Sequence, residues 1–291
     1  MKEEMVIGLL FPGDMGLAVA ELLLKNNFRV ITTTRGRSQK TIDNIKDTAI
    51  QDFASLHDVV EASDIILSIN SPNKSFEIAE EICNCISDRS KKKIFIDLNS
   101  NTPESAIKID QLFTLKNAIY VNGAVLGASK DMDKDSVIVL SGRERKQIIK
   151  FFDGIFNTKD AGEKIESASA YKLLFSLVNK GINAVFFEAM ASASHYGIVD
   201  ELITSLQLYL PGTFEDLEKT TPTYISHIER RIHEMQGLSD MQNSQGLPSS
   251  ISSAAAKTFE IVNESKIFSN TKAITVLETF QLFKNLKEDN K

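Results

Sequence analysis

The chain has 291 residues, of which 42% are hydrophobic and 25% are charged, and its formal net charge is −6. This size and composition indicate a folded protein of one or two domains with a sizeable core, and they argue against long disordered segments. The negative charge argues against nucleic acid as a partner, because phosphate binding needs a concentrated basic face.

Residues 1–162 alternate apolar strands with helical patterns, which is typical of a parallel sheet covered by helices on both faces. We expect strands near residues 5–10, 29–33, 64–69, 94–97, 118–122 and 136–141. We expect helices near residues 14–26, 40–46, 55–61, 74–86, 103–114 and 143–155. The sequence therefore predicts an α/β domain of the Rossmann type, with a doubly wound parallel sheet, over residues 1–162.

The strand pattern fades after Gly162, and residues 163–291 are expected to form an all-helical C-terminal domain. A periodic segment from Glu166 to Tyr196 predicts a long interdomain helix, and Gly197 accepts the left-handed conformation that ends many helices. Further helices are expected near residues 200–208, 213–218, 221–237, 248–263 and 269–285. The turn-rich stretch 237–250 is expected to join two of them.

Cysteines, histidines and hydropathy add little that is specific. Cys83 and Cys85 form a C-x-C pair in a helical pattern, where two reduced and partly buried thiols are expected. His227 and His233 are six residues apart and do not share a helix face, so we predict no metal site. The sequence begins without a charged-then-apolar leader, and no apolar run reaches membrane-spanning length. We therefore expect a cytoplasmic protein with no membrane partner.

The stretch MVIGLLFPGDMG, from Met5 to Gly16, runs from an apolar strand through glycines into an amphipathic helix. Gly13 and Gly16 fill two of the three glycine positions of the dinucleotide-binding motif G-x-G-x-x-G, and Phe11 fills the first. Glycines there allow close approach of a pyrophosphate and tight packing of the helix on the strand, and the start of the helix offers free N–H groups. We expect a nicotinamide dinucleotide to bind here; a plain strand-to-helix connection is the alternative. The residues expected at the cofactor are Phe11, Pro12, Gly13, Asp14 and Met15.

The residues after the second strand indicate which cofactor binds. An acidic residue there usually accepts hydrogen bonds from the adenosine ribose, and the sequence has none at that position. It has two arginines and several hydroxyl groups instead, which suit the 2′-phosphate of NADP. We therefore expect NADP to be preferred, with NAD possible; the alternative is that both arginines are solvated loop charges. The residues behind this expectation are Thr34, Arg35, Arg37 and Ser38.

Small polar residues follow the next three predicted strands. Asn70, Ser71 and Pro72 follow the third, Asn99 the fourth and Gly123 the fifth. Ligands of open α/β sheets bind outside the carboxyl ends of the strands, so we expect these residues to surround the nicotinamide. For any single one of them, ordinary turn chemistry is the simpler explanation.

The long helix carries five polar residues on one face, and its other faces are mostly apolar. This polar stripe consists of Lys172, Ser176, Asn179, Lys180 and Asn183. On a mostly buried helix such a stripe faces either water or a cleft, and its amides and hydroxyl favour a cleft that orients a polar ligand. Gly181, inside the helix, indicates close approach of another helix or of substrate.

A resemblance to a known family covers almost the whole chain. It is carried by IGLLFPGDMG (7–16), SDIILSINSP (63–72), IDLNSNTPE (96–104), VNGAVLGAS (121–129), VIVLSG (137–142) and SASAYKLLFSLVNKGINAVFFEAMA (167–191). In order and spacing these stretches resemble the β-hydroxyacid dehydrogenases, relatives of 3-hydroxyisobutyrate and 6-phosphogluconate dehydrogenases. The nearest branch has a 6-phosphogluconate-dehydrogenase-like C-terminal domain. The resemblance implies a catalytic lysine, which matches Lys172.

The chain departs from the family pattern around the substrate. The family's substrate loop, D-x-P-x-S-G-G, falls on residues 122–128, where Gly127 is kept and Leu126 replaces the serine. The asparagine pair that follows the family's lysine falls on Phe175 and Ser176. These departures argue against a substrate that closely resembles hydroxyisobutyrate or phosphogluconate.

We expect an NADP-preferring oxidoreductase that moves a hydride between nicotinamide and a small, anionic hydroxy acid. Lys172 is the expected proton-transfer group, because burial and the positive charge of Lys180 would lower the pKa of its amine toward neutrality. The alternatives are an imine-reductase-like enzyme that uses NADPH, and a non-catalytic NADP-binding sensor or scaffold. The residues expected to position substrate are Asn99, Gly123, Gly127, Ser176, Asn179 and Lys180.

The long helix also predicts how the protein assembles. It is apolar round most of its circumference, and the elements after residue 197 are too few to cover it, so we expect a homodimer through the helical domains. Arg230 and Arg231, in HIERRIHEM, are candidates for binding a substrate carboxylate or phosphate, either within one chain or across this interface; solvated arginines are the alternative.

Overall fold

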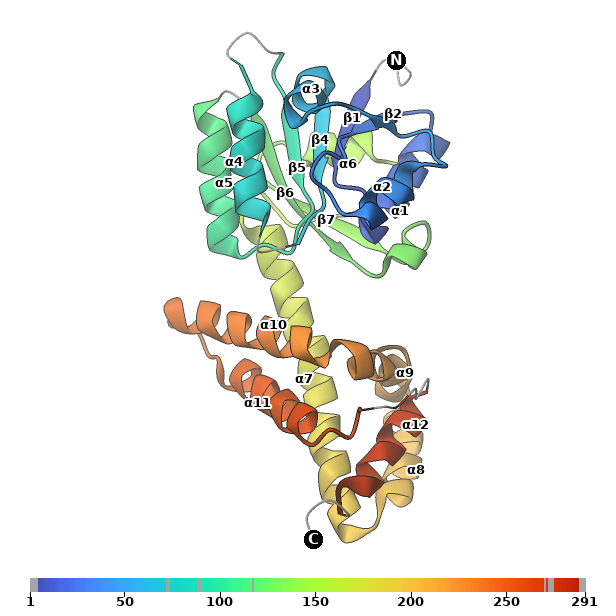
Figure 1. Cartoon of the computed structure of the whole chain (residues 1–291). Coiled ribbons are helices and arrows are strands. Elements are labelled where there is room, and N and C mark those ends of the chain that lie inside the picture. The colour runs from blue at the N-terminus through green and yellow to red at the C-terminus, as the bar shows by residue number, and fades with distance from the viewer. Residues whose placement is uncertain are drawn as a thin grey trace. The chain divides into compact units, whose positions relative to one another are not determined.

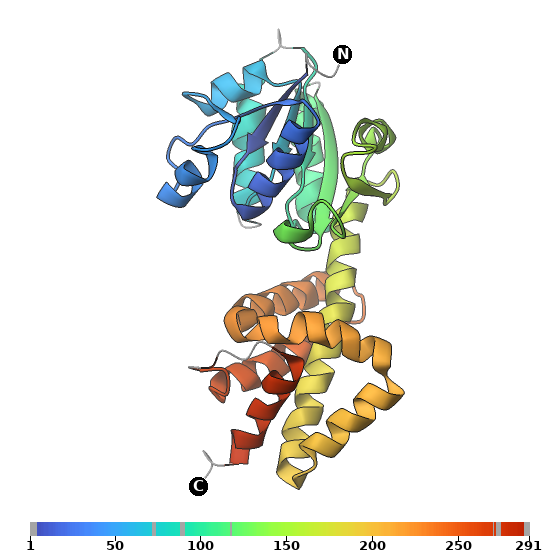
Figure 2. The same ribbon diagram turned by 90° about the vertical axis from the view of Figure 1, so that its right-hand side faces the viewer.

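The computed structural model describes residues 5–71, 74–87, 91–116, 118–269, 271 and 275–287. The chain forms two compact units, Met1–Leu173 and Leu174–Lys291, which Figures 1 and 2 show from two sides. The division lies inside helix α7 (Ser167–Tyr196), whereas the sequence analysis expected it at residue 162. The start of α7 belongs to the first unit because it is bonded to the sheet: Ala168 N–H donates to Ser141 Oγ (3.0 Å), and Asn122 Nδ2 donates to Ser169 Oγ (2.9 Å).

The first unit is built on one eight-stranded sheet with the strand order β3-β2-β1-β4-β5-β6-β7-β8. Its strands are β1 (Val6–Leu10), β2 (Arg29–Thr32), β3 (Gln51–Asp52), β4 (Ile65–Ser68), β5 (Ile94–Asp97), β6 (Ile119–Leu126), β7 (Val137–Ser141) and β8 (Asn157–Asp160). All neighbouring strands are parallel except β6 and β7. This confirms the predicted Rossmann-type sheet.

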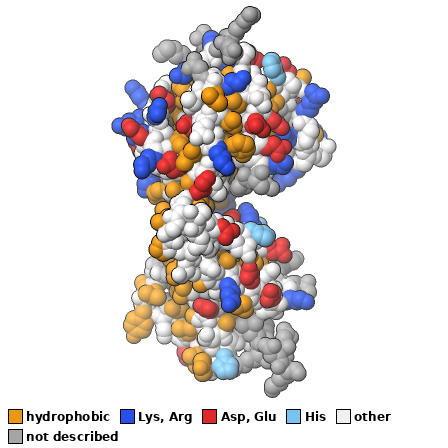
Figure 3. Space-filling view, turned by 90° about the vertical axis from the view of Figure 1, so that its left-hand side faces the viewer, with side chains coloured by type: hydrophobic (Ala, Val, Ile, Leu, Met, Phe, Trp, Pro, Cys, Tyr) orange, Lys and Arg blue, Asp and Glu red, His pale blue; other side chains and the backbone are white. Residues whose placement is uncertain are grey.

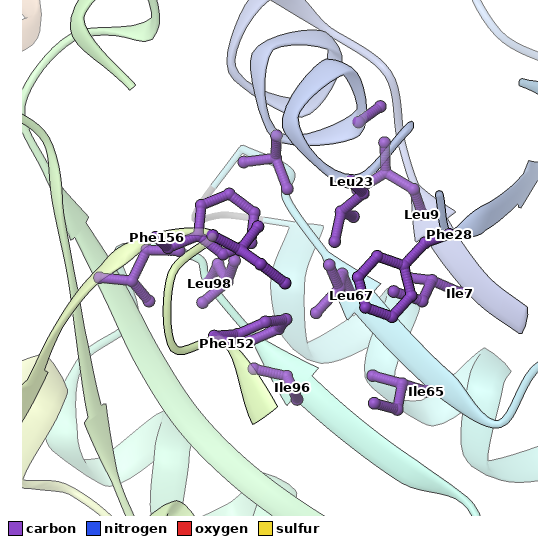
Figure 4. Packing of buried hydrophobic residues seen from close by; sticks show 14 of the residues in the cluster. Ile7, Leu9, Leu23, Phe28, Ile65, Leu67, Ile96, Leu98, Phe152 and Phe156 are labelled. Carbon is purple, nitrogen blue, oxygen red and sulfur yellow. The ribbon is translucent and has the colours of Figure 1, made fainter. Parts of the chain in front are cut away.

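Helices cover both faces of the sheet, as the alternation of buried residues requires. The helices are α1 (Asp14–Lys25), α2 (Gln39–Ile45), α3 (Leu56–Ala62), α4 (Ser75–Cys85), α5 (Pro103–Leu115) and α6 (Arg145–Phe151). Ile65 and Leu67 of β4 face the core under α1 and α6, which Figure 4 shows from close by. Ile66, between them, faces the opposite core under α3, α4 and α5.

Two strands of the sheet were not predicted. Strand β3 has only two residues, both exposed, and β8 (Asn157–Asp160) is polar, so neither has the apolar signal on which sequence reasoning depends. Strand β6 also runs four residues past its predicted end, because its second half pairs with β7.

The second unit is helical, as predicted. Beyond α7 it contains α8 (Val199–Tyr209), α9 (Pro211–Thr220), η4 (Thr221–Thr223), α10 (Tyr224–Ser244), α11 (Ser250–Glu264), α12 (Val276–Gln281) and η5 (Leu282–Lys287). Its core is aromatic: the ring of Phe187 on α7 lies within about 6 Å of the rings of Tyr224, Phe259, Phe268 and Phe283. Part of the helix expected at 269–285 lies outside the described residues.

The stretch expected to be a turn at 237–250 is mostly helix. Helix α10 continues past Gly237 to Ser244, which leaves only residues 245–249 to connect it to α11. The prediction was wrong because Leu238 and Met241 continue the buried face of α10, and Gln242 accepts a hydrogen bond from Ser252 of α11 (2.7 Å). Burial of these side chains outweighs the weak helix propensity of glycine, serine and asparagine.

Helix α7 is apolar and only partly covered. Its exposed side chains include Leu174, Phe175, Val178 and Val185, and Figure 3 shows hydrophobic side chains at the surface of the helical unit. Among the described residues, α7 is long and apolar enough to cross a membrane by length and composition alone, which corrects the expectation that no run reaches that length. The five polar residues of its stripe are too few to offset the apolar residues between them. A helix that packs in a protein core or interface passes the same test.

Two glycines were singled out from the sequence, Gly181 inside α7 and Gly197 directly after it. Gly197 has a φ of +74° directly after the last residue of the helix, as predicted. A Cβ on Gly181 would lie 3.6 Å from Ile251 Cγ2, which is an ordinary contact distance. Helix α11 therefore approaches Gly181 to contact distance without requiring a glycine there, and the approach of a substrate stays a prediction.

Candidate functional site

The glycine turn between β1 and α1 has room for a ligand at one glycine and none at the other. A Cβ on Gly13 would meet no atom within 4 Å, whereas one on Gly16 would lie 2.3 Å from the carbonyl oxygen of Phe11. Gly13 occupies the N-cap position of α1 and has no side chain to cap the helix, so first-turn N–H groups remain for an anion. Phe11 and Pro12 are buried, and Asn44 Nδ2 of α2 donates to the Pro12 carbonyl (2.8 Å). The turn fits a dinucleotide pyrophosphate.

The loop after β2, residues 33–38, lies against this turn, and we call the two together the β2 end. The guanidinium of Arg37 lies 3.6 Å from the centre of the Phe11 ring. Arg35 and Arg37 are both exposed. Ser38 caps α2 by accepting a hydrogen bond from the N–H of Thr41 (3.3 Å). Phe11, in the first glycine position, thus serves as a platform for one of the two arginines.

An acidic side chain does reach the end of β2, contrary to the expectation from sequence. It is Asp52, from the neighbouring strand β3. Its carboxylate accepts the N–H of Thr34 (2.9 Å) and the Thr34 hydroxyl (2.5 Å). The sequence analysis missed Asp52 because β3 has no strand signal. Asp14, at the first turn of α1, is paired with Lys40 (2.8 Å), and Met15 is half-buried behind it.

The loops after β4 and β5 are joined by hydrogen bonds, and we call them the β5 end. Asn99 Oδ1 accepts the N–H of Asn70, and Asn70 Nδ2 donates to the carbonyl of Leu10 (3.0 Å). Asn99 Nδ2 donates to Ser68 Oγ (3.0 Å). Asn70 and Asn99, predicted separately from two loops, therefore form one network that reaches β1. Ser71 is exposed beside them, and Pro72 lies outside the described residues.

Asp97, the last residue of β5, underlies this network and was given no role by the sequence analysis. It is fully buried, and its carboxylate accepts from Asn99, Asn101 Nδ2 (2.6 Å) and Ser75 Oγ (3.0 Å). Burial raises its pKa to about 6, although these hydrogen bonds oppose the rise. The D-x-N spacing was the available signal, since an aspartate at the end of a strand can accept the N–H two residues ahead in its own loop.

Gly123 lies on the part of β6 that extends past the end of β5, and Gly127 directly follows the strand. A Cβ on Gly123 would come within 2.7 Å of Leu98 Cδ2, so packing excludes any side chain there. Gly127 has a φ of +117°, and a Cβ on it would lie 2.4 Å from Ser136 Oγ. Packing therefore explains the glycine at position 123, and packing and the positive φ explain the one at position 127. Leu126, between them, is only half-buried.

Lys172 is hydrogen-bonded to this same part of β6. Its Nζ donates to the carbonyl of Val125 at 2.7 Å, three residues along β6 from Asn122, which bonds Ser169 one turn earlier on α7. Asn122 also donates to the carbonyl of Ile165 (2.8 Å). The start of α7 is thereby held along β6, and the predicted catalytic lysine lies at the loop predicted to bind substrate.

The other polar residues of α7 belong to the helical unit and are used within it. Lys180 Nζ pairs with Glu234 of α10 (2.9 Å) and donates to Ser176 Oγ (3.0 Å). Asn183 is buried and bonds Asn179, Thr220 and Thr221. Lys180 is therefore paired, and is not available as the neighbouring positive charge that the sequence analysis assigned to it.

Arg230 and Arg231 are also engaged within the helical unit. Arg230 pairs with Glu234 (3.5 Å), and Arg231 lies over the ring of Tyr224 (3.7 Å) and donates to Thr223. Cys83 and Cys85 are free thiols, and burial raises the pKa of both. Among the described residues, no three His, Cys, Asp or Glu side chains are grouped to hold a metal ion.

Comparison with known families identifies the sheet unit. Residues 5–157 match the model of the NAD binding domain of 6-phosphogluconate dehydrogenase, and residues 193–262 match a domain of unknown function, DUF1932. The chain therefore belongs to the 6-phosphogluconate dehydrogenase-type NAD-binding family. Its class is that of the NAD(P)-dependent hydroxyacid dehydrogenases, oxidoreductases that act on CH–OH groups.

Two curated proteins are similar over most of their length. An uncharacterized 28.5 kDa protein of Methanothermus fervidus is 27% identical over 79% of this chain and 88% of its own. Glyoxylate/succinic semialdehyde reductase 1 of Arabidopsis thaliana is 21% identical over 69% of this chain and 71% of its own.

Solved structures share the fold across both units. A conserved hypothetical protein of Sinorhizobium meliloti has a TM-score of 0.76 at 20% identity, covering 97% of each chain. Mycobacterium tuberculosis 3-hydroxyisobutyrate dehydrogenase with L-serine has a TM-score of 0.71 at 14% identity, covering 97% of this chain and 99% of its own. A reductive aminase of Aspergillus terreus, in complex with NADPH and ethyl-5-oxohexanoate, has a TM-score of 0.56 at 17% identity, covering 89% and 94%. At these identities the likeness is one of fold.

Proposed function

We propose that the protein is an NADP-preferring oxidoreductase that moves a hydride between nicotinamide and the carbinol carbon of a small, anionic hydroxy acid, with Lys172 as the proton-transfer group. The observation that carries this proposal is the bond from Lys172 Nζ to the Val125 carbonyl (2.7 Å). It holds an amine against the part of β6 that extends past the end of β5. The carboxyl ends of the parallel strands are where α/β folds bind their ligands.

The β2 end supports the choice of NADP. Arg35 and Arg37 are exposed there, and Phe11 holds the guanidinium of Arg37 beside the glycine turn. Charge-assisted hydrogen bonds from arginine to phosphate are stronger than those to a ribose hydroxyl, so a 2′-phosphate gains more from this loop. Asp52 is already used by Thr34, which leaves it less available to a ribose than an unpaired carboxylate would be.

The chemistry divides between cofactor and protein. When bound, nicotinamide supplies the hydride acceptor or donor. Lys172 takes the hydroxyl proton as the alcohol is oxidised, and it returns a proton to the carbonyl oxygen in the reverse direction. Asn99 and the backbone of Gly123–Gly127 orient the substrate.

We also propose that the protein is a homodimer. Leu174, Val178 and Val185 recur along one face of α7 and are exposed, and a second copy of the helical unit would cover them. Light scattering at micromolar concentration is expected to give about twice the 32.3 kDa chain mass. A monomer at that concentration contradicts this assembly.

Turnover tests the proposed reaction. Purified protein is mixed with NADPH and a panel of short oxo acids and semialdehydes, or with NADP⁺ and the matching hydroxy acids, and the cofactor absorbance is followed. Turnover of at least one pair is expected. Turnover of cyclic imines alone would overturn the alcohol chemistry in favour of an imine reductase, and cofactor binding without turnover of any substrate would overturn the proposal.

A further inference from the structure

We propose that Asp97 is a positioning residue for the cofactor, which acts through Asn99 and Asn70 on the loops that hold the nicotinamide. This inference rests on the proposed function, since it assumes that nicotinamide binds at the β5 end. Nothing in the family match assigns a role to Asp97, and it touches none of the residues proposed to transfer a proton.

A continuous chain of hydrogen bonds connects Asp97 to the glycine turn. Asp97 Oδ1 accepts the backbone N–H of Asn99 (3.0 Å) and its Nδ2 (2.6 Å), which fixes which way the Asn99 amide faces. The Asn99 oxygen is thereby free to accept the N–H of Asn70. Asn70 Nδ2 in turn bonds the carbonyl of Leu10, the residue before Phe11. The carboxylate thus orders the ends of three strands, β1, β4 and β5.

The second oxygen of Asp97 anchors the network from the other side. Oδ2 accepts Ser75 Oγ (3.0 Å), from the first residue of α4, and Asn101 Nδ2 (2.6 Å). Each carboxylate oxygen therefore accepts two hydrogen bonds, and an ionised carboxylate is the form that accepts all four. A protonated Asp97 must release at least one of these donors.

Asp97 has no ion pair with any lysine, arginine or histidine in the part of the chain that the structure describes. The titratable groups that face it are Tyr120 of β6, whose pKa is raised by burial and by Asp97, and beyond it Asp110 of α5. With a pKa of about 6, Asp97 is mostly ionised at pH 7.5 and mostly protonated at pH 5. The order of the β5 end is therefore coupled to pH.

The experiment measures cofactor affinity against pH. NAD⁺ is titrated into the full-length protein by calorimetry between pH 7.5 and 5; NAD⁺ is the probe because it lacks a 2′-phosphate, whose own pKa is about 6. For the wild type we expect about tenfold weaker binding at pH 5, with a midpoint near 6. For Asp97→Asn we expect weaker binding at pH 7.5 and no step. A wild type without the step, or an Asp97→Asn variant that keeps it, overturns the inference.

Two further variants keep the test decisive if Asp97→Asn does not fold. Ser75→Ala removes a donor that favours the ionised form, so it should move the midpoint to higher pH; an unmoved midpoint contradicts the inference. Ser63→Ala, which removes a buried hydroxyl at the amino edge of the same sheet, should keep the wild-type profile. If the wild type binds neither NAD⁺ nor NADP⁺ at any pH, the proposed function fails; if it binds without a pH step, only this inference fails.

Discussion

At the β2 end, Arg35 and Arg37 are exposed, whereas at the β5 end Asp97 and Asn99 are buried and fully hydrogen-bonded to their neighbours. Exposed charges interact with a ligand through a screened field and tolerate replacement, so the β2 end is suited to choosing between ligands that differ by one phosphate. Buried polar groups are costly to disturb and hold atoms in fixed places. The β5 end and the Lys172 contact are therefore suited to chemistry, which depends on geometry.

The largest effect is expected at Lys172. Lys172→Met should lower kcat by about 10²–10⁴-fold and leave the affinity for NADPH unchanged, because the side chain is proposed to serve proton transfer and not cofactor binding. Steady-state kinetics with an active substrate, together with NADPH titration, measures both. Lys159→Met is the matched control, since Lys159 lies in the same unit and bonds Tyr171, the neighbour of Lys172. If Lys172→Met keeps kcat within a few-fold of wild type, the proton is transferred elsewhere.

Asp97 should contribute a pH dependence of stability that is opposite in sign to that of carboxylates whose pKa is lowered on folding. Its pKa rises from 3.8 to about 6 on folding, so the native state binds the proton more tightly than the unfolded state between these values. The free energy of unfolding should therefore fall as pH rises from about 4 to about 6, by up to ~3 kcal/mol, and change no further above that range. Other carboxylates, such as Asp160, have lowered pKa values and act in the opposite direction.

The contribution of Asp97 is isolated by comparison with Asp97→Asn. Urea unfolding of both proteins at several pH values gives the difference in free energy, which removes the shared carboxylates. We expect the free energy of unfolding of the wild type to fall, relative to that of Asp97→Asn, as the pH rises from 4 to 6. A difference that is constant with pH would mean that Asp97 is not protonated in this range.

The two glycines of the β1 turn should respond differently to the same substitution. Gly16→Ala places a methyl group against the Phe11 carbonyl, so it should cost about 1–3 kcal/mol of stability. Gly13→Ala meets open space, so stability should change by less than ~1 kcal/mol. Because that space is where the pyrophosphate is proposed to lie, Gly13→Ala should still weaken cofactor binding at least about tenfold. Thermal unfolding and NADPH titration of both variants distinguish these roles; equal affinity in Gly13→Ala would refute the assignment.

The smallest effect is expected at the β2 end. NADP⁺ should bind at least about tenfold more tightly than NAD⁺, and Arg35→Glu should abolish or reverse that ratio. Arg29→Glu is the control, because Arg29 lies at the amino end of β2, opposite to Arg35, and donates hydrogen bonds to Gln51. Calorimetric titration with both cofactors gives the ratios. Equal affinities in the wild type would show that the two arginines do not select a phosphate.

Elements with strong apolar patterns were predictable from sequence, and the partners of polar residues were not. The strands β1, β4 and β5 and the long helix follow from periodicity alone. Strand β3 has two exposed residues, so the sequence held no sign that Asp52 would reach Thr34. Gly237 was predicted to begin a turn. Burial of Leu238 and Met241 keeps it in a helix instead, and only the tertiary structure reveals that burial.

The candidate site was predicted as a set of residues and not as a set of bonds. Asn70, Asn99 and Lys172 were found because they follow strands or interrupt an apolar helix. That Asp97 connects the first two, that Val125 holds the third, and that Glu234 pairs with Lys180 depends on register and helix packing. The bonds from Asn70 to Asn99, from Lys172 to Val125 and from Lys180 to Glu234 join residues far apart in the sequence, so local patterns carry no signal for them.

The transfer of a hydride is the central claim, and isotopic labelling tests it most directly. NADPH carrying deuterium at the reactive C4 position is incubated with the protein and with glyoxylate, succinic semialdehyde and related short oxo acids, and the products are examined by mass spectrometry. The account predicts deuterium bonded to the new carbinol carbon of at least one hydroxy acid, and its near-complete loss in Lys172→Met. Oxidation of the cofactor with no deuterium in any carbinol product would contradict it.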